Sequence, residues 1–336
     1  SAASDVYKRQ DTVSDFCDHE IRPMVTENYD GGDLVLGTSG LVLSPKEFPH
    51  LTGLKGRTLL TSDGTTILGA DDKAGIAEIL TMIERIQTEN RPHGTICVAF
   101  TPDEEIGMGA EHFNLDQFGA EYAYTLDGDS EGEIQYENFN ACKAEFEIRG
   151  FNVHPGEGKD TMINASLVAI EINNCLPSME TPRGTEDYEG FYHLISMQGE
   201  VGEAKLNYIV RDHDKNGFEE RKKTLRLIEK NLNAKWGEGT VTLKITDQYL
   251  NMKEIVEEHM HLIDHAKKAC EAAGVAPLIL PIRGGTDGCQ LSFKGLPCPN
   301  LGTGGHAFHG PYEHISVEGM EKSVELLLAL IQEYTK

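Results

Sequence analysis

The sequence lacks long apolar runs, an excess of basic residues and paired cysteines. No apolar run approaches the roughly 18 residues that are needed to span a bilayer. The 336 residues include 30 Lys and Arg against 55 Asp and Glu, a formal net charge of -25, which argues against nucleic acid or an anionic membrane surface as partners. The seven cysteines form no CxxC pair, so a reducing cytoplasm is the simplest location.

The rest of the composition is that of an ordinary globular protein. Hydrophobic residues make up 39% of the chain and charged residues 25%. A chain of this length can bury a full core and form two domains. The many acidic side chains also offer hard oxygen ligands, so metal binding is compatible with the charge.

The first part of the chain follows an α/β pattern. Residues 13–57 read as irregular, a hairpin is expected over 58–68, and strands are expected over 95–100 and 121–126. The helix between the hairpin and the first strand should place one apolar face on the core, formed by Ile76, Ile79, Leu80, Ile83 and Ile86. The pattern returns from about residue 253 and ends in a helix that Ser316 caps.

The pattern changes to that of a second domain between residues 137 and 252. Alternation of apolar and charged residues over 142–149 predicts a half-exposed strand. The elements expected after it complete the order βαββαβ, which is the ferredoxin-like pattern. We therefore expect an α/β domain over 1–136 and 253–336, split by an inserted ferredoxin-like domain over 137–252.

Four acidic residues and one histidine come just after predicted strands of the α/β domain. They are Asp71, Glu104, Glu105, Asp127 and His309. Loops in this position share one edge of a parallel sheet, so these residues can converge. Carboxylates and imidazoles suit zinc, and of two adjacent carboxylates one can hold metal while the other moves protons. The structural alternatives are helix caps for Asp71 and the glutamate pair, and a turn for Asp127.

Several longer motifs are distributed along the chain: GADDKAG, FTPDEEIG, YTLDGD, NVHPG, PIRGGTDG and His309-Gly310. Together they resemble the peptidase T family, the tripeptide aminopeptidases of the dizinc exopeptidase superfamily, from Asp11 to the C-terminus. The resemblance implies a split catalytic zinc-binding domain with an inserted lid and dimerisation domain. It also implies a cytoplasmic homodimer that acts on small peptides with two Zn²⁺ ions per subunit.

The same resemblance assigns roles to the residues of the α/β domain. Asp71 would bridge the two zinc ions, Asp127 would help to hold the first, and Glu105 and His309 would complete the second. His306 would not be a ligand. Glu104 would be the general base that deprotonates the attacking water and later protonates the leaving amine.

Three residues would contact the substrate. His154 would reach the site of a partner subunit and stabilise the oxyanion, and Arg283 would pair with a substrate carboxylate. Asn164 is a weaker candidate, and a plain helix-start residue is the reading we favour for it. The alternatives for His154 and Arg283 are a loop histidine and a surface ion pair.

The chain departs from the family at its start. The family pattern is His-x-Asp-Thr; Asp11, the orienting residue, and Thr12 are present, but Arg9 stands at the zinc-ligand position. Residues 1–10 show no period and read as a foreign leader, so we expect the first zinc site to be impaired. The main hypothesis is a tripeptide aminopeptidase. The alternatives are a dizinc dipeptidase, an N-acyl-amino-acid amidohydrolase, or an inactive metal-binding fragment.

Overall fold

The computed structural model describes residues 4–9, 16 and 19–335, so Asp11 lies outside the described residues. The chain divides into two compact units. The first unit comprises Ser1–Tyr136, Met252–Leu280 and Thr286–Lys336, and the second comprises Glu137–Asn251 and Pro281–Gly285. These boundaries lie within one residue of 136 and 252, whereas residues 281–285 belong to the second unit and not, as the sequence analysis had them, to the first.

A six-stranded sheet forms the centre of the first unit, in the order β13-β8-β14-β7-β1-β6. Its strands are β1 (Ser4–Arg9), β6 (Val98–Thr101), β7 (Tyr122–Gly128), β8 (Glu133–Gln135), β13 (Leu278–Ile279) and β14 (Asn300–Gly302). Neighbouring strands run parallel except β14 and β8. The sequence analysis expected no regular structure before residue 11; in the structure, β1 pairs with both β6 and β7.

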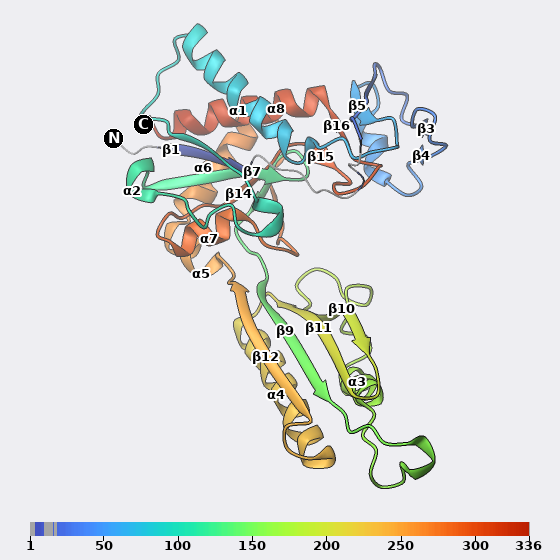
Figure 1. Ribbon diagram of the computed structural model, residues 1–336. Helices are drawn as coiled ribbons and strands as arrows, with labels where there is room; N and C mark the ends of the chain where they lie inside the picture. The colour runs from blue at the N-terminus through green and yellow to red at the C-terminus, as the bar shows by residue number, and fades with distance from the viewer. Residues whose placement is uncertain (1–3, 10–15, 17–18, 336) are drawn as a thin grey trace. The chain divides into compact units, whose positions relative to one another are not determined.

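Helices cover both faces of this sheet. They are α1 (Ala70–Thr88), α2 (Leu115–Phe118), α5 (Lys253–Val256), α6 (His261–Ala272), α7 (Asp287–Phe293) and α8 (Val317–Glu333). Figure 1 shows α1 and α8 on one side of the sheet and α7 on the other. Burial on both faces explains the continuous apolar runs of the central strands. No helix within the described residues is long and apolar enough to cross a bilayer.

The predicted cap of α8 and the predicted apolar face of α1 are observed, with the exception of one residue of α1. The Ser316 side chain accepts a hydrogen bond from the Gly319 backbone N–H at 3.0 Å, so the predicted cap of α8 is confirmed. Ile79 and Ile86 of α1 are buried as expected, but Leu80 is 53% exposed. Its assignment to the apolar face was wrong, because Met82 provides the buried contact instead.

A smaller antiparallel sheet has the order β15-β16-β5-β2. Its strands are β2 (Pro23–Thr26), β5 (Leu59–Ser62), β15 (Gly305–His306) and β16 (His314–Ser316); β3 (Leu34–Val35) pairs with β4 (Val42–Leu43), and η1 spans Pro49–Leu54. The hairpin predicted over 58–68 was wrong, because β5 pairs with β2 and β16 and not with the residues that follow it. Strands that are distant in the sequence thus pair with β5, where the sequence predicted pairing with the adjacent residues.

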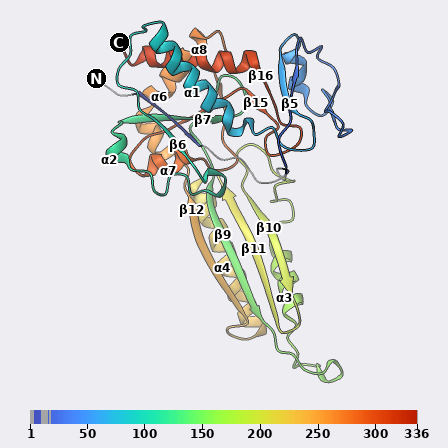
Figure 2. The same cartoon turned by 45° about the horizontal axis from the view of Figure 1, so that its top comes forward.

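The second unit contains, in chain order, β9 (Asn140–Arg149), η3 (Pro155–Glu157), α3 (Ala165–Asn174), β10 (Phe191–Gly199), β11 (Glu203–Asp212), α4 (Lys215–Trp236) and β12 (Val241–Tyr249). Its strands form an antiparallel sheet in the order β10-β11-β9-β12 (Figure 2). Alternate residues of β9, among them Phe146, are buried with residues of α3 and α4 in one core. The alternation predicted for this strand is therefore observed.

Two leucines of α4 allow a matched test of this core. Leu225 is fully buried, whereas Leu227 is 55% exposed on the same helix. Leu225→Ala should lower the free energy of unfolding of the second unit by about 2–5 kcal/mol, because it leaves a cavity. Leu227→Ala should change it by about 0.5 kcal/mol or less. The single tryptophan, Trp236, lies on α4, so its fluorescence during urea unfolding reports this unit. Equal effects of the two changes would contradict the packing described here.

Candidate metal centre

Three segments of the first unit bring acidic side chains and a histidine to one place. The first is the start of α1 with Asp71, and the second is η2 (Glu104–Ile106), which follows β6 and carries Glu105. The third is the turn between β15 and β16, where His309 has a positive φ of 63°. Only η2 follows a strand of the parallel sheet, because β5, β15 and β16 belong to the antiparallel sheet. The expectation that Asp71 and His309 also follow parallel strands was therefore wrong, although the three segments do converge.

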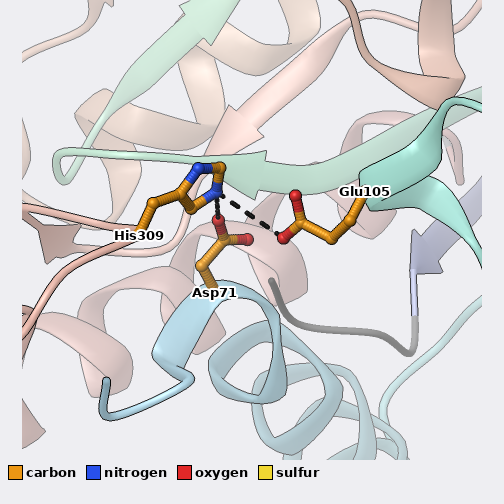
Figure 3. Close-up of side chains that lie close together, drawn as sticks. All are labelled: Asp71, Glu105 and His309. Carbon is orange, nitrogen blue, oxygen red and sulfur yellow. Dashed lines mark hydrogen bonds and ion pairs between the residues drawn. The ribbon is translucent and has the colours of Figure 1, made fainter. Parts of the chain in front are cut away.

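Asp71, Glu105 and His309 form the first group of ligand atoms. The His309 Nε2 atom lies 2.9 Å from Asp71 Oδ2 and 3.6 Å from Glu105 Oε1 (Figure 3). The side chains of Asp71 and Glu105 are 5% and 11% exposed, whereas that of His309 is 51% exposed. One atom from each residue lies within 4.8 Å of the other two, a spacing that allows all three to contact one ion.

Asp71 also belongs to a second group, with Asp72 and Asp127, whose ligand atoms again lie within 4.8 Å of one another. Asp127 is near the end of β7. Asp72 is only 2% exposed, and the sequence analysis did not single it out. The available signal was its place beside Asp71 in the ADDK motif.

Glu313 fixes the backbone that carries Asp71. Its carboxylate accepts hydrogen bonds from the Gly69 N–H at 2.6 Å and from the Asp71 N–H at 2.9 Å. Glu313 is 1% exposed, and burial raises its pKa, while these backbone donors oppose the shift. This residue was not among those predicted from the sequence, where its only signal is its nearness to His309.

Glu104 is in the loop that follows β6, and Asp287 contacts this loop. Glu104 is 9% exposed and belongs to neither group of ligand atoms. The Thr101 hydroxyl donates to Asp287 Oδ2 at 2.9 Å, and a Cβ at Gly109 would lie 2.2 Å from the same oxygen. Burial chiefly, and then the Asp287 and Glu104 carboxylates, raise the pKa of Cys289 to about 12. Asp287 therefore contacts both ends of the loop that carries Glu104.

The donor set fits a divalent transition metal. Two carboxylates and one imidazole are ligands typical of catalytic zinc sites, where a further position stays open. The separation of 2.9 Å between His309 Nε2 and Asp71 Oδ2 is close to the roughly 3.3 Å that two ligands at 2.0–2.1 Å from a tetrahedral zinc would have. Asp71 belongs to both groups of ligand atoms.

The remaining predicted site residues lie in the second unit. His154 is exposed, and its Nδ1 accepts from the Gly156 N–H at 3.2 Å. Asn164 caps α3 through the Leu167 N–H, the helix-start role that the sequence analysis favoured. The Arg283 guanidinium donates to the carbonyls of Asp187, at 2.7 Å, and Glu189, at 3.1 Å. It also donates to the Thr185 hydroxyl at 2.9 Å. These partners are backbone and hydroxyl oxygens and not the surface carboxylate of the alternative interpretation.

His306, the rival ligand, belongs instead to a cluster of three histidines. Its ring stacks on that of His50 with centroids 4.0 Å apart, and the Nε2 atoms of His50 and His314 are 2.9 Å apart. The His314 Nδ1–H donates to the Tyr312 carbonyl, so its Nε2 accepts from His50 when both rings are neutral. Burial, with the neighbouring imidazoles, lowers the pKa of His306 to about 3 and that of His314 to about 4.

Comparison with known proteins identifies the family. The model of peptidase family M20/M25/M40 matches residues 64–333. The chain belongs to this family. It is 52% identical to Peptidase T of Caldanaerobacter subterraneus subsp. tengcongensis over 97% of this chain and 80% of that protein.

Solved structures agree with this membership of the M20/M25/M40 family. Aminopeptidase PepT from Bacillus cereus superposes with a TM-score of 0.79 at 25% identity, covering 100% of this chain and 82% of that one. The Bacillus subtilis YXEP protein, described as a dinuclear metal-binding peptidase of the M20 family, has a TM-score of 0.62 at 15% identity and covers 99% of this chain and 82% of its own. The chain described here is accordingly a peptidase, an enzyme of the hydrolase class.

The histidine cluster predicts acid sensitivity of the first unit. Because the folded-state pKa of His314 lies below the ordinary value of 6.5, the unfolded chain binds more protons as the pH falls from 6.5 towards 4. Stability is therefore lost over that window, by up to about 2 kcal/mol between pH 7 and 5 for this one group.

Urea unfolding followed by far-UV circular dichroism at the two pH values tests this expectation. His314→Gln should lose less stability between pH 7 and 5 than the unchanged protein, because glutamine does not titrate. His112 is exposed, and His112→Gln should show the full loss. Identical losses in all three proteins would show that the cluster does not titrate as described.

Proposed function

We propose that the chain is a metal-dependent aminopeptidase that releases the N-terminal residue from tripeptides in the cytoplasm. The observation that carries the proposal is the convergence of Asp71, Glu105 and His309 into one potential metal site, next to the loop that holds the buried Glu104. Support for the substrate class comes from the relatives, which are named Peptidase T at 51–54% identity.

Zinc is the ion we propose, with two sites that share Asp71. Glu105 and His309 would complete one site, and Asp127, with Asp72 beside it, would contribute to the other. In such a site zinc polarises a carbonyl oxygen and lowers the pKa of water towards neutrality. Because Arg9 stands where the family has a histidine ligand, we expect the Asp127 site to bind zinc more weakly. Asp11 would orient that missing ligand in the family pattern.

Residues of the chain would carry out proton transfer, positioning and substrate binding. Glu104 would accept the proton of the attacking water and return it to the leaving amine, since a carboxylate outside the two groups of ligand atoms can exchange protons. Glu313 and Asp287 would keep Asp71 and the Glu104 loop in position through the hydrogen bonds described above. The Arg283 guanidinium would bind a substrate carboxylate, and Asn164 would be a further substrate contact.

A substrate panel tests the proposed activity. Zinc-loaded protein should hydrolyse tripeptides faster than dipeptides or N-acetylated amino acids. Preference for dipeptides would favour a dipeptidase, and preference for N-acetylated amino acids would favour an amidohydrolase. No hydrolysis of any of the three, with metal bound, would favour the inactive metal-binding fragment.

The two adjacent glutamates should respond differently to substitution. Glu104→Ala should retain bound zinc, and kcat on a tripeptide should fall by roughly 10²–10⁴, the usual contribution of a positioned general base. Glu105→Ala should lose zinc from the His309 site, and excess metal should partly restore its activity. Elemental analysis and steady-state rates measure both effects.

The reverse result would show that the two roles are exchanged, with Glu104→Ala losing metal and Glu105→Ala keeping it. If neither change affects metal or rate and each only lowers stability by about 1 kcal/mol, the pair is an acidic helix cap.

We also propose that the second unit is a ferredoxin-like lid and dimerisation domain. Its edge strand β10 exposes Ile195 (56%) and Met197 (40%), and α3, which packs against β10, exposes Leu167 (61%) and Ile170 (45%). An unpaired strand edge beside apolar side chains is suited to pair with a second copy of the chain. The partner's His154 would then serve the oxyanion.

Two leucine-to-lysine changes separate this interface from a general surface effect. Leu167→Lys, on α3, should shift a dimer towards monomer, because it places a charge in the proposed contact. Leu227→Lys, on α4, replaces a leucine of similar exposure (55%) and should leave the dimer intact. Sedimentation velocity distinguishes the outcomes, and a wild-type protein that sediments only as monomer would exclude the interface.

A further inference from the structure

A second histidine cluster lies around the start of α6, away from the candidate metal centre. His259 ends η4 (Glu257–His259), and His261 and His265 are on α6. The ring centroids of His259 and His261 are 6.1 Å apart, and those of His261 and His265 are 5.8 Å apart. All three side chains are half-buried, and none takes part in the function proposed above.

The spacing of these residues suits chelation. His261 and His265 are four residues apart on one helix and thus share a face, as the two histidines of helical zinc motifs do. Three imidazoles bound at 2.0–2.1 Å to a tetrahedral ion have ring centroids about 5 Å apart. The observed separations exceed that value by about 1 Å, which rotation of the side chains can supply.

The surroundings favour neutral imidazoles. The Nδ1 atom of His265 is buried without a hydrogen-bond partner. Burial lowers the pKa of His261 and of His265, and in each case a neighbouring histidine adds to the shift. Neutral imidazole is the form that binds metal. The nearby acids Asp264 and Glu333 oppose the shift for His265 and would offset part of a bound ion's charge.

The cluster is at the opposite end of the sheet from Asp71. Tyr122, the first residue of β7, contacts the rings of His259 and His261 at centroid distances of 5.5 and 4.6 Å. Asp127 lies five residues further along the same strand, which corresponds to about 16 Å. The two places are therefore separate sites and not parts of one centre.

We propose that His261 and His265, with His259 as a third ligand, form a separate binding site for a borderline divalent transition metal such as Zn²⁺, Ni²⁺ or Cu²⁺. Nitrogen ligands without carboxylates in the set disfavour Mg²⁺ and Ca²⁺. Within residues 19–335, the groups with three ligand atoms already within 4.8 Å are the two at Asp71, so this site assembles when the ion binds. A cavity of about 620 Å³, lined in part by Tyr122 and His259, gives solvent access beside it.

Nickel titration of the untagged full chain by calorimetry tests the proposal. Asp71→Asn serves as the background, because it removes the ligand common to both groups of the candidate metal centre. In this background we expect one Ni²⁺ equivalent, which the added pair His261→Gln and His265→Gln abolishes. His265→Gln alone should weaken binding by at least about tenfold, since the second ligand of a linked pair acts at high effective concentration.

Exposed histidines elsewhere provide the control. His112→Gln and His193→Gln, both exposed residues, should leave the nickel affinity unchanged. His259→Gln should weaken binding less than His265→Gln if it is the third ligand. Unchanged stoichiometry and affinity in the His261→Gln/His265→Gln protein, with an unchanged circular dichroism spectrum, would overturn the proposal. Equal binding of Mg²⁺ at this site would overturn the assignment of the metal class.

Discussion

The burial of several carboxylates in one place is the constraint on which the functional end of the first unit depends. Asp71, Asp72, Glu104 and Glu313 are each 9% exposed or less, although ionised acids strongly prefer water. Protein donors offset part of this cost, among them the two backbone N–H groups that face Glu313. A cation bound at the proposed metal centre would offset more of this cost, so removal of the metal would also destabilise the fold around it.

Local patterns predicted those parts of the fold in which neighbours in sequence are neighbours in space. The alternation in β9, the cap at Ser316 and the order βαββαβ depend on a few consecutive residues or elements. The acidic loops were found for a similar reason, since each follows a strand that its composition reveals. The geometry of parallel sheets accounts for Glu105 and Asp127, which lie at the ends of β6 and β7, whereas Asp71 and His309 reach the site from the antiparallel sheet.

The features that sequence reasoning missed depend on long-range partners. The residues after β5 resemble a hairpin, but β16, more than 240 residues later, occupies the strand's edge. Glu313 accepts from the backbone of Asp71, and Asp287 contacts Thr101; an acid at either position reveals nothing of this alone. Residues 281–285 join the second unit through two backbone hydrogen bonds: the Ile282 N–H donates to the Glu137 carbonyl, and the Phe139 N–H donates to the Gly284 carbonyl. Because this short segment has no hydrophobic periodicity of its own, its sequence does not reveal which unit it belongs to.

The path of the backbone between the units restricts how proteins of this kind can be rebuilt. The chain passes from one unit to the other at 136/137, 251/252, 280/281 and 285/286. A chimaera that exchanges only residues 137–251 with a relative would therefore separate Phe139 from its native partner at Gly284. Transfer of the second unit as a module requires both segments, and a protease that cuts one connection does not release it. The second unit thus consists of two separate chain segments, and the shorter one has five residues.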